Sequence, residues 1–198
     1  MNPEQTPNSR NSPEDHERSI EQTPPSIYVA SLADYVNGYL TGAWIDASQD
    51  IDTIREEIQA MLATSKSEAP EEYAIHDFEG FGTLRLGEYE DIERIAAIAE
   101  GIKEHGEAFA CWIDHTGFDP EDWHKFEDAY LGTYDSIEAY ADQMIDDLDL
   151  EASLDESVPE SFRSYARIDR DALVRDLEYG DIWHMDFDGQ VLVFNSHI

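Results

Sequence analysis

The fold of this chain is decided around residues 126–148, whose sequence is FEDAYLGTYDSIEAYADQMIDDL. Residues 129–134 are apolar and aromatic and predict a strand, although they could also prolong a preceding helix. Asp135 and Ser136 then supply a helix N-cap, and apolar residues recur at helical spacing behind it. They are Ile137, Tyr140, Ala141, Met144, Ile145 and Leu148. One face of this helix is therefore expected to be buried.

The opposite face of the same helix is acidic. Its carboxylates recur every three or four residues, at Asp135, Glu138, Asp142, Asp146 and Asp149. An ordinary solvated face mixes Lys with Glu, which stabilises a helix by roughly 0.2–0.5 kcal/mol per pair. Here no cation is present and the like charges repel, so the pattern favours a functional role. It places a carboxylate about every 5–6 Å, against one phosphate per about 3.4 Å along a DNA strand.

The whole chain is acidic. It carries 46 Asp and Glu against 12 Lys and Arg, a net charge of −34, and residues 126–162 hold twelve acids without a Lys or Arg. Such a charge opposes binding to nucleic acid or to an anionic membrane and favours a strongly basic partner, typically a groove built to hold DNA or RNA. Because 41% of the residues are apolar and 11% aromatic, the composition indicates a folded body.

Outward from the central stretch, the chain divides into four segments. Residues 1–25 are polar and contain five Pro, which predicts a disordered tail. Residues 26–88 predict an N-terminal α+β domain, residues 89–125 a helical middle domain, and residues 126–198 a C-terminal α+β domain. The helical segment is too small to be stable alone and must pack on its neighbours. The predicted fold class is α+β with three small domains.

Individual elements follow from local signals. Apolar runs predict strands over residues 27–30, 43–45, 73–78, 182–187 and 191–194, the last two joined at an Asp188-Gly189 turn. Apolar periodicity predicts a helix after Asp50, another with an apolar stripe from Ile92 to Ile102 that is stopped by Gly106, and others over residues 107–115 and 169–178. Asp119 and Pro120 mark the start of a further helix.

No catalytic or metal-binding motif stands out in the sequence. A P-loop, a paired CxxC and an HExxH are all missing, and Asp186-Phe187-Asp188-Gly189 matches only part of a calcium loop. Cys111 precedes His115 by four residues, but a buried free thiol is the more common case. No apolar run approaches the length of a membrane span, and a single cysteine suits a reducing compartment. We expect a cytoplasmic protein that is not an enzyme and holds no metal or cofactor.

Several segments, taken together in order and spacing, resemble the ArdA antirestriction proteins, DNA mimics carried by plasmids and conjugative elements. The matching segments are residues 27–32, 42–45, 73–80, 126–134 (continuing through Ser136 to Ala141, and similar to the family's antirestriction motif), 175–177, 180–181 and 191–194. The resemblance covers about residues 26–198. It implies an elongated, curved arrangement of three domains, a homodimer, and an acidic face shaped like bent B-DNA. It also implies binding in the DNA groove of the methyltransferase core of type I restriction-modification enzymes, without catalysis or a cofactor.

The charge pattern and the resemblance together define two candidate sets of residues. The first, called here the acidic surface, would mimic DNA and comprises Asp119, Glu121, Asp122, Glu127, Asp128, Asp135, Glu138, Asp142, Asp146, Asp147 and Asp149. The second comprises residues of the antirestriction motif that we expect at the contact between two protomers: Phe126, Ala129, Tyr130, Leu131, Gly132 and Tyr134.

Two other functions fit the composition. The chain could be an acidic cytosolic enzyme adapted to high salt, which would unfold at low salt. It could also be an acidic scaffold for basic DNA-binding proteins, which would not select among basic partners. The sequence leaves open which restriction systems are inhibited and whether modification is blocked as well as restriction.

Overall fold

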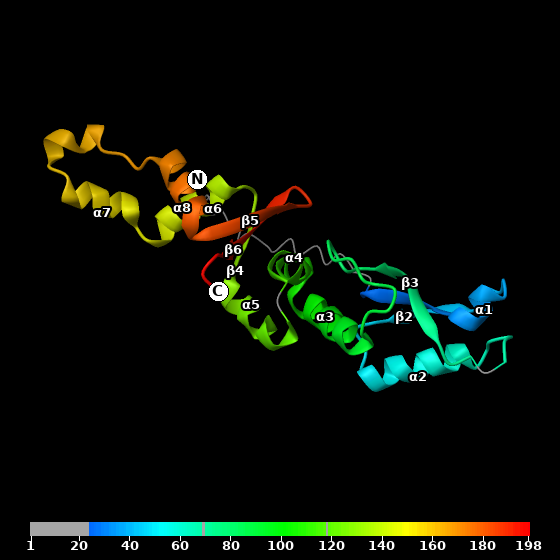
Figure 1. The fold of residues 1–198 in the computed structure, drawn as a ribbon. Helices are drawn as coiled ribbons and strands as arrows, with labels where there is room; N and C mark the ends of the chain where they lie inside the picture. The colour runs from blue at the N-terminus through cyan, green and yellow to red at the C-terminus, as the bar shows by residue number, and fades with distance from the viewer. Residues whose placement is uncertain (1–23, 69, 118) are drawn as a thin grey trace, which may run out of the picture.

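The computed structural model describes residues 24–68, 70–117 and 119–198. The predicted tail, residues 1–25, lies outside the described residues except for Pro24 and Pro25. Helices alternate with two small antiparallel sheets, so the fold is α+β, as predicted (Figure 1). The first sheet has the strand order β2-β1-β3 and the second has the order β4-β6-β5.

The first sheet is built by β1 (Ser26–Ser31), β2 (Gly42–Asp46) and β3 (Tyr73–Glu79). Helix α1 (Leu32–Val36) follows β1 directly, and α2 (Ile51–Leu62) packs on β1 and β2. The carboxylate of Asp50 accepts a hydrogen bond from the backbone N–H of Asp52, so the predicted N-cap of α2 is confirmed.

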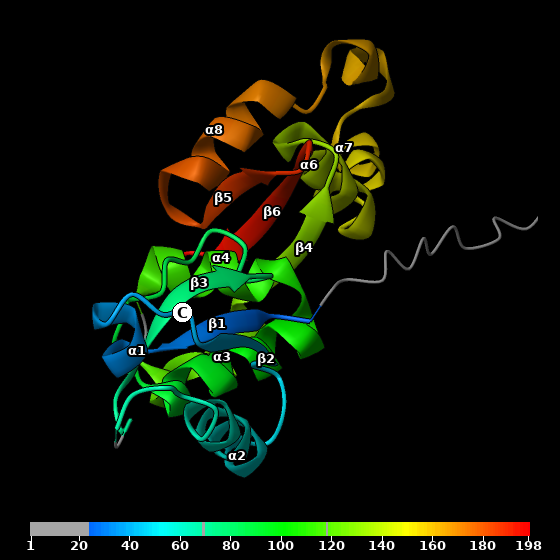
Figure 2. The same cartoon turned by 90° about the vertical axis from the view of Figure 1, so that its right-hand side faces the viewer.

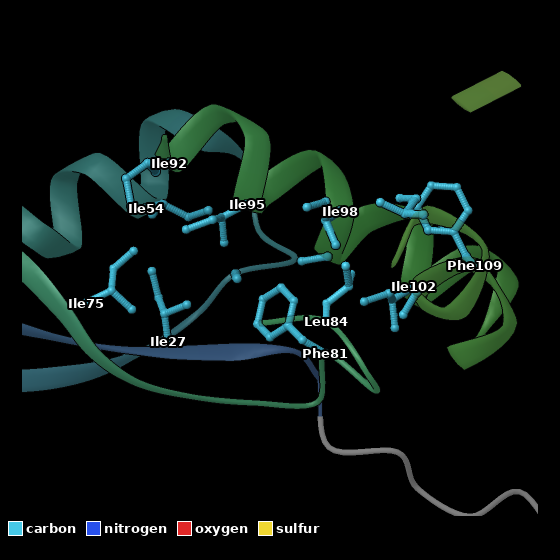
Figure 3. Packing of buried hydrophobic residues seen from close by; sticks show 14 of the residues in the cluster. Ile27, Ile54, Ile75, Phe81, Leu84, Ile92, Ile95, Ile98, Ile102 and Phe109 are labelled. Carbon is cyan, nitrogen blue, oxygen red and sulfur yellow. The ribbon is translucent and has the colours of Figure 1, made fainter. Parts of the chain in front are cut away.

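One core joins the first sheet to the middle helices, α3 (Ile92–His105) and α4 (Glu107–Thr116). Figure 3 shows the row formed by Ile92, Ile95, Ile98 and Ile102 on α3, which faces Ile27 and Ile75 of the sheet. The spacing of three and four residues puts these isoleucines on one helix face. The middle helices therefore share their core with the first sheet, as the small size of the segment requires.

Gly101 permits the close approach of α3 and α4. A Cβ atom at this position would lie 2.1 Å from a ring carbon of Phe109. Since the Phe109 side chain is buried in the same core, any larger residue at position 101 would displace that ring.

The second sheet is buried on both faces. It consists of β4 (Tyr130–Tyr134), β5 (Ile182–Phe187) and β6 (Gln190–Asn195). Along β6, Leu192 and Phe194 point into the core of the middle helices, whereas Val191 and Val193 belong to a second core cluster, because side chains alternate across a strand.

Different helices cover the two faces of this sheet. Helices α4 and α5 (Phe126–Ala129) supply side chains to the core on one face, and α6 (Ile137–Asp147) and α8 (Arg170–Gly180) pack on the other. Figure 2 shows α6 and α8 beside the second sheet and α3 behind the first sheet.

Aromatic rings fill the junction between the middle helices and the second sheet. The ring of Phe126 lies 5.6 Å from that of Trp112 and 5.3 Å from that of Tyr130. The imidazole of His115 stacks on the indole of Trp183 at 3.9 Å. Ring pairs of this kind contribute beyond their buried area, so the two parts of the chain are held by specific contacts.

Some local expectations need correction. Residues 120–125 form a 3-10 helix, η1 (Pro120–Lys125), and the side chain of Asp119 makes no cap hydrogen bond. The chain then passes through α5 into β4, which resolves the strand-or-helix alternative for residues 130–134 in favour of a strand. Leu148, which the periodicity places on the buried face, is 61% exposed because α6 ends at Asp147.

Three short helical elements were not predicted. They are α1, α7 (Leu150–Ser157) and the 3-10 helix η2 (Glu160–Tyr165). Helix α7 buries none of its residues, so its sequence shows no core-facing stripe from which it could be inferred.

The cysteine is a core residue. Cys111 is fully buried in α4, and burial raises the pKa of its thiol. His115 is turned toward Trp183 instead, so the two residues do not form a nucleophile and base pair.

Candidate protein-binding surface

Helix α6 carries the centre of the acidic surface. Its N-cap is Ser136, whose hydroxyl oxygen accepts a hydrogen bond from the N–H of Ala139 at 3.2 Å. Ala141 and Ile145 are buried, and Ala141 belongs to the second core cluster, so the other side of the helix is turned toward solvent. Consequently the stripe formed by Glu138, Asp142 and Asp146 is exposed.

The carboxylate of Glu138 is held in its charged form. A hydrogen bond with its own backbone and one with Ser136 lower the pKa of Glu138 below its ordinary value. The effect is favoured by the first turn of α6, where the partial positive charge of the helix dipole lies. The charge of this residue is therefore kept over the whole neutral pH range.

The two elements before β4 carry the second part of the acidic surface. On α5, Phe126 and Ala129 are buried while Glu127 and Asp128 between them are exposed. On η1, Asp122 is half-buried and pairs with Lys125 at 2.7 Å. One of the predicted carboxylates is thus partly neutralised by its own helix.

Ten of the eleven predicted carboxylates of the acidic surface are exposed, Asp122 being the exception. The exposed ones are Asp119, Glu121, Glu127, Asp128, Asp135, Glu138, Asp142, Asp146, Asp147 and Asp149. Exposure leaves these groups available to a partner.

An arginine distant in sequence reaches the acidic stripe. The guanidinium of Arg170, at the start of α8, donates to Asp142 at 2.5 Å and to Glu151 of α7 at 2.9 Å. These bonds raise the pKa of Arg170, with the Asp142 contact as the largest cause. The stripe therefore contains one paired carboxylate, and the local sequence gives no sign of it because the two residues lie 28 positions apart.

Further exposed acids lie outside the predicted set. Helix α7, which follows α6 in the chain, carries three more exposed acids, Glu151, Asp155 and Glu156. Elsewhere in the chain, exposed acids are paired: Arg55 of α2 forms ion pairs with Asp52 of the same helix and with Glu93 of α3. The acids of α7 belong to the same cation-free run, so the charge pattern contains the signal that would have included them.

The segment that resembles the antirestriction motif, residues 126–134, contains both buried and exposed side chains. Phe126 and Ala129 lie inside the core of the chain. The phenol of Tyr134 donates to the backbone oxygen of Leu131 at 3.1 Å, and both side chains face the second core cluster. Strand β4 lies at the edge of its sheet, so its outer backbone edge is not paired within the sheet. This edge and the exposed side chain of Thr133 could contact another chain.

Gly132 is required by this strand. Its φ is +130°, and a Cβ atom there would lie 3.1 Å from the Tyr134 ring. The strand register shifts between Tyr130 and Gly132, so the glycine lies at a bulge. The bulge interrupts the alternation of side chains, since Leu131 and Tyr134, three residues apart, both pack on the second cluster.

Within the described part of the chain, no group of three or more His, Cys, Asp or Glu side chains is arranged to hold a metal ion. None of the helices described there is long and apolar enough to cross a membrane. The described residues therefore form an acidic α+β protein with an exposed field of carboxylates.

Comparison with known proteins supplies the family. A family model described as "Antirestriction protein (ArdA)" matches residues 27–188, most of the chain. This chain therefore belongs to the ArdA antirestriction family, in agreement with the resemblance drawn from its motifs. No curated protein sequence matches it significantly.

Proposed function

We propose that this chain is a DNA mimic that occupies the DNA-binding groove of type I restriction-modification enzymes and blocks restriction. The observation that carries the proposal is the exposed carboxylate stripe of α6, Glu138, Asp142 and Asp146, on a chain of the antirestriction family. A stripe of like charges raises the free energy of its own helix, so a partner that neutralises the charges gains that energy on binding.

The quantity of charge is sufficient to replace a stretch of duplex. With the tail residues 1–25 excluded, the body carries −31. At about 1.7 Å of duplex axis per charge, two such bodies equal roughly 105 Å of DNA, or about 31 base pairs. Paired carboxylates such as Asp142 and Asp122 lower this figure but leave enough charge to fill a DNA-binding groove.

A homodimer is part of the proposal, because two bodies are needed to span such a groove. The three segments 26–88, 89–125 and 126–198 would act as domains of an elongated, curved molecule. The edge strand β4 supports a contact between second sheets, since an open strand edge is a template for pairing with another chain. Like-charge repulsion between the two bodies is offset there by backbone hydrogen bonds.

The direct test is competition for a purified type I methyltransferase core with labelled target duplex. We expect the protein to displace the duplex at low salt, and a variant with Glu138→Gln, Asp142→Asn and Asp146→Asn to displace it less well. A basic nucleoid protein assayed in parallel separates this function from that of a general acidic scaffold. Failure to displace duplex from enzymes of several type I systems at low salt would exclude the proposed function.

A further inference from the structure

Helix α7 has little apolar contact to hold it against the rest of the molecule. None of its residues is buried, and within the described part of the chain none belongs to either core cluster. Its N-cap residue, Asp149, makes no side-chain cap hydrogen bond and has a left-handed backbone with φ +52°, which costs free energy for a residue with a Cβ atom. Figure 1 shows α7 at the end of the molecule away from the first sheet. Because helices in proteins are stabilised mainly by burial of an apolar face, packing alone gives α7 little stability.

Charge also opposes the position of α7. Residues 137–157, which span α6 and α7, contain eight acids and no Lys or Arg. Like charges repel each other, yet the two helices are in contact. A cation from another part of the chain is therefore needed to hold them side by side.

Arg170 supplies this cation. Its Nε donates to the carboxylate of Asp142 on α6 at 2.5 Å, and its Nη2 donates to that of Glu151 on α7 at 2.9 Å. Both carboxylates thus lie within hydrogen-bond reach of one planar guanidinium, whose rigid fork fixes the orientation of the groups that it binds. The guanidinium therefore sets how α7 lies relative to the acidic stripe of α6.

Arg170 is itself held in place by α8, whose first residue it is. The carboxylate of Asp169 caps this helix by accepting a hydrogen bond from the backbone N–H of Ala172 at 3.0 Å. Further along α8, Val174 and Leu177 are buried in the second core cluster. The guanidinium consequently links a weakly packed helix to an element that is anchored in the core.

We propose that Arg170 is a positioning residue for binding to the restriction enzyme: it holds α7 beside α6, so that Glu151, Asp155 and Glu156 are presented together with the α6 stripe. The inference rests on the proposed function. The simpler alternative is that Arg170 only neutralises acids, and the two roles predict opposite effects. Removal of a neutralising cation should strengthen binding to a basic groove, whereas removal of a positioning residue should weaken binding even though the variant is more acidic.

The test compares three variants. Arg170→Gln removes both the charge and the fork, and Arg170→Lys keeps the charge on a compact ammonium that lacks the planar fork. The matched control is Arg55→Gln, which removes the same charge from a guanidinium that pairs with Asp52 and Glu93, both outside the acidic surface. Dissociation constants for a purified type I methyltransferase core are measured at several salt concentrations. Hydrogen exchange of the α7 backbone in the free protein reports on that helix, and urea midpoints report on the whole fold.

We expect Arg170→Gln to bind about tenfold more weakly at low salt, because several α7 carboxylates, each contributing up to about fivefold, lose their position together. Its affinity should also depend less steeply on salt, since fewer carboxylates engage the enzyme, and the α7 amides should exchange faster. Arg170→Lys should lie between this variant and the wild type. Arg55→Gln should bind at least as tightly as the wild type, with unchanged exchange in α7.

A second pair of variants keeps Arg170 and covers the case in which Arg170→Gln lowers the urea midpoint more than the control does. Glu151→Gln releases α7 from the guanidinium. Glu156→Gln removes the same charge from an exposed α7 acid for which the described residues show no ion pair. We expect Glu151→Gln to weaken binding more than Glu156→Gln and to be the one that speeds exchange in α7.

Three results would overturn the inference and leave the proposed function standing. Wild-type or tighter binding by Arg170→Gln would mean that Arg170 only neutralises acids. Weaker binding without faster exchange in α7 would mean that Arg170 acts by a contact of its own with the enzyme. Equal binding and equal exchange for Glu151→Gln and Glu156→Gln would mean that the Glu151 bond does not position α7. Absence of wild-type binding would overturn the proposed function, and the inference with it.

Discussion

Asp34 shows how a single carboxylate is used inside a chain that otherwise displays its acids. Burial opposes its charge, but hydrogen bonds from Ser67, Thr41 and the backbone of Lys66 outweigh burial and hold the pKa of Asp34 well below the usual carboxyl range. Its folded-state pKa is thus lower than its unfolded value. The resulting stabilisation is present above about pH 4 and is lost as the pH falls through the folded-state pKa.

We expect Asp34→Asn to lower the urea midpoint at pH 7, because the amide donates where the carboxylate accepted and leaves backbone N–H groups unpaired. The difference from the wild type should shrink as the pH is lowered below about 4. Asp155→Asn, at an exposed position on α7, serves as the control and should leave the midpoint unchanged. A midpoint for Asp34→Asn equal to that of the control at pH 7 would mean that the buried carboxylate does not stabilise the fold.

The ion pairs of Arg170 could not be predicted from the sequence. The acids of α6 are correctly placed on its exposed face from periodicity alone, because spacing determines which side of a helix a residue occupies. Their pairing with Arg170 depends on how α6, α7 and α8 pack, and nothing local encodes it. The same holds for Asp34, whose partners Lys66 and Ser67 lie more than thirty residues away in the sequence.

At the scale of elements, the helices and strands that were predicted correctly are those specified by a local sequence feature. Caps at Asp50 and Ser136 and apolar stripes predict α2, α3 and α6, and an Asp-Gly pair at 188–189 predicts the β5–β6 hairpin. Helices α1 and α7 were missed because they are short and bury little. Their existence depends on tertiary contacts such as those of Asp34 and Arg170.

If the carboxylates of the α6 stripe act together in binding, no single one of them should be essential. Asp146→Asn alone should change the dissociation constant by less than about fivefold, since an exposed charge pair contributes about 0–1 kcal/mol. Adding Glu138→Gln and Asp142→Asn should weaken binding stepwise and reduce its salt dependence. Competition titrations of the series measure both effects.

Thermal unfolding of the same series provides the control for α6. Relief of like-charge repulsion should leave the melting temperature of Asp146→Asn equal to or above that of the wild type. Asp142→Asn should gain least, because it also removes the bond to Arg170. Complete loss of inhibition from one neutral substitution in a folded variant would contradict collective mimicry and indicate a single essential carboxylate.

The edge strand β4 gives a prediction about assembly. Thr133→Glu places a charge on the exposed side of that strand, where a paired second sheet would have to desolvate it. We expect a dimer for the wild type and a shift toward monomer for this variant by sedimentation velocity at micromolar concentration. Thr53→Glu, exposed on α2, adds the same charge elsewhere and should remain dimeric. An unchanged dimer in Thr133→Glu would move the contact away from β4.

At the scale of the whole molecule, the proposed imitation of DNA depends on charge density. A duplex carries one charge per about 1.7 Å of axis and a condensed counterion layer, whose release gives DNA binding its steep salt dependence. The carboxylates of α6 follow one another at about 5–6 Å, and some are already paired within the chain. We therefore expect fewer counterions to be condensed on the protein than on a DNA duplex of the same length.

We accordingly expect the affinity of the protein for a type I methyltransferase to fall with salt, but less steeply than the affinity of duplex DNA for the same enzyme. Proteins that make six to ten phosphate contacts lose about 10³–10⁵ in affinity for DNA between 50 and 200 mM salt, and this protein should lose less. Its advantage as a competitor should thus increase as salt rises toward physiological values. Parallel titrations of one enzyme with labelled duplex and labelled protein give the two slopes. An equal slope would mean that the folded surface reproduces the full charge density of DNA, and a slope of zero would mean that apolar contact alone drives binding.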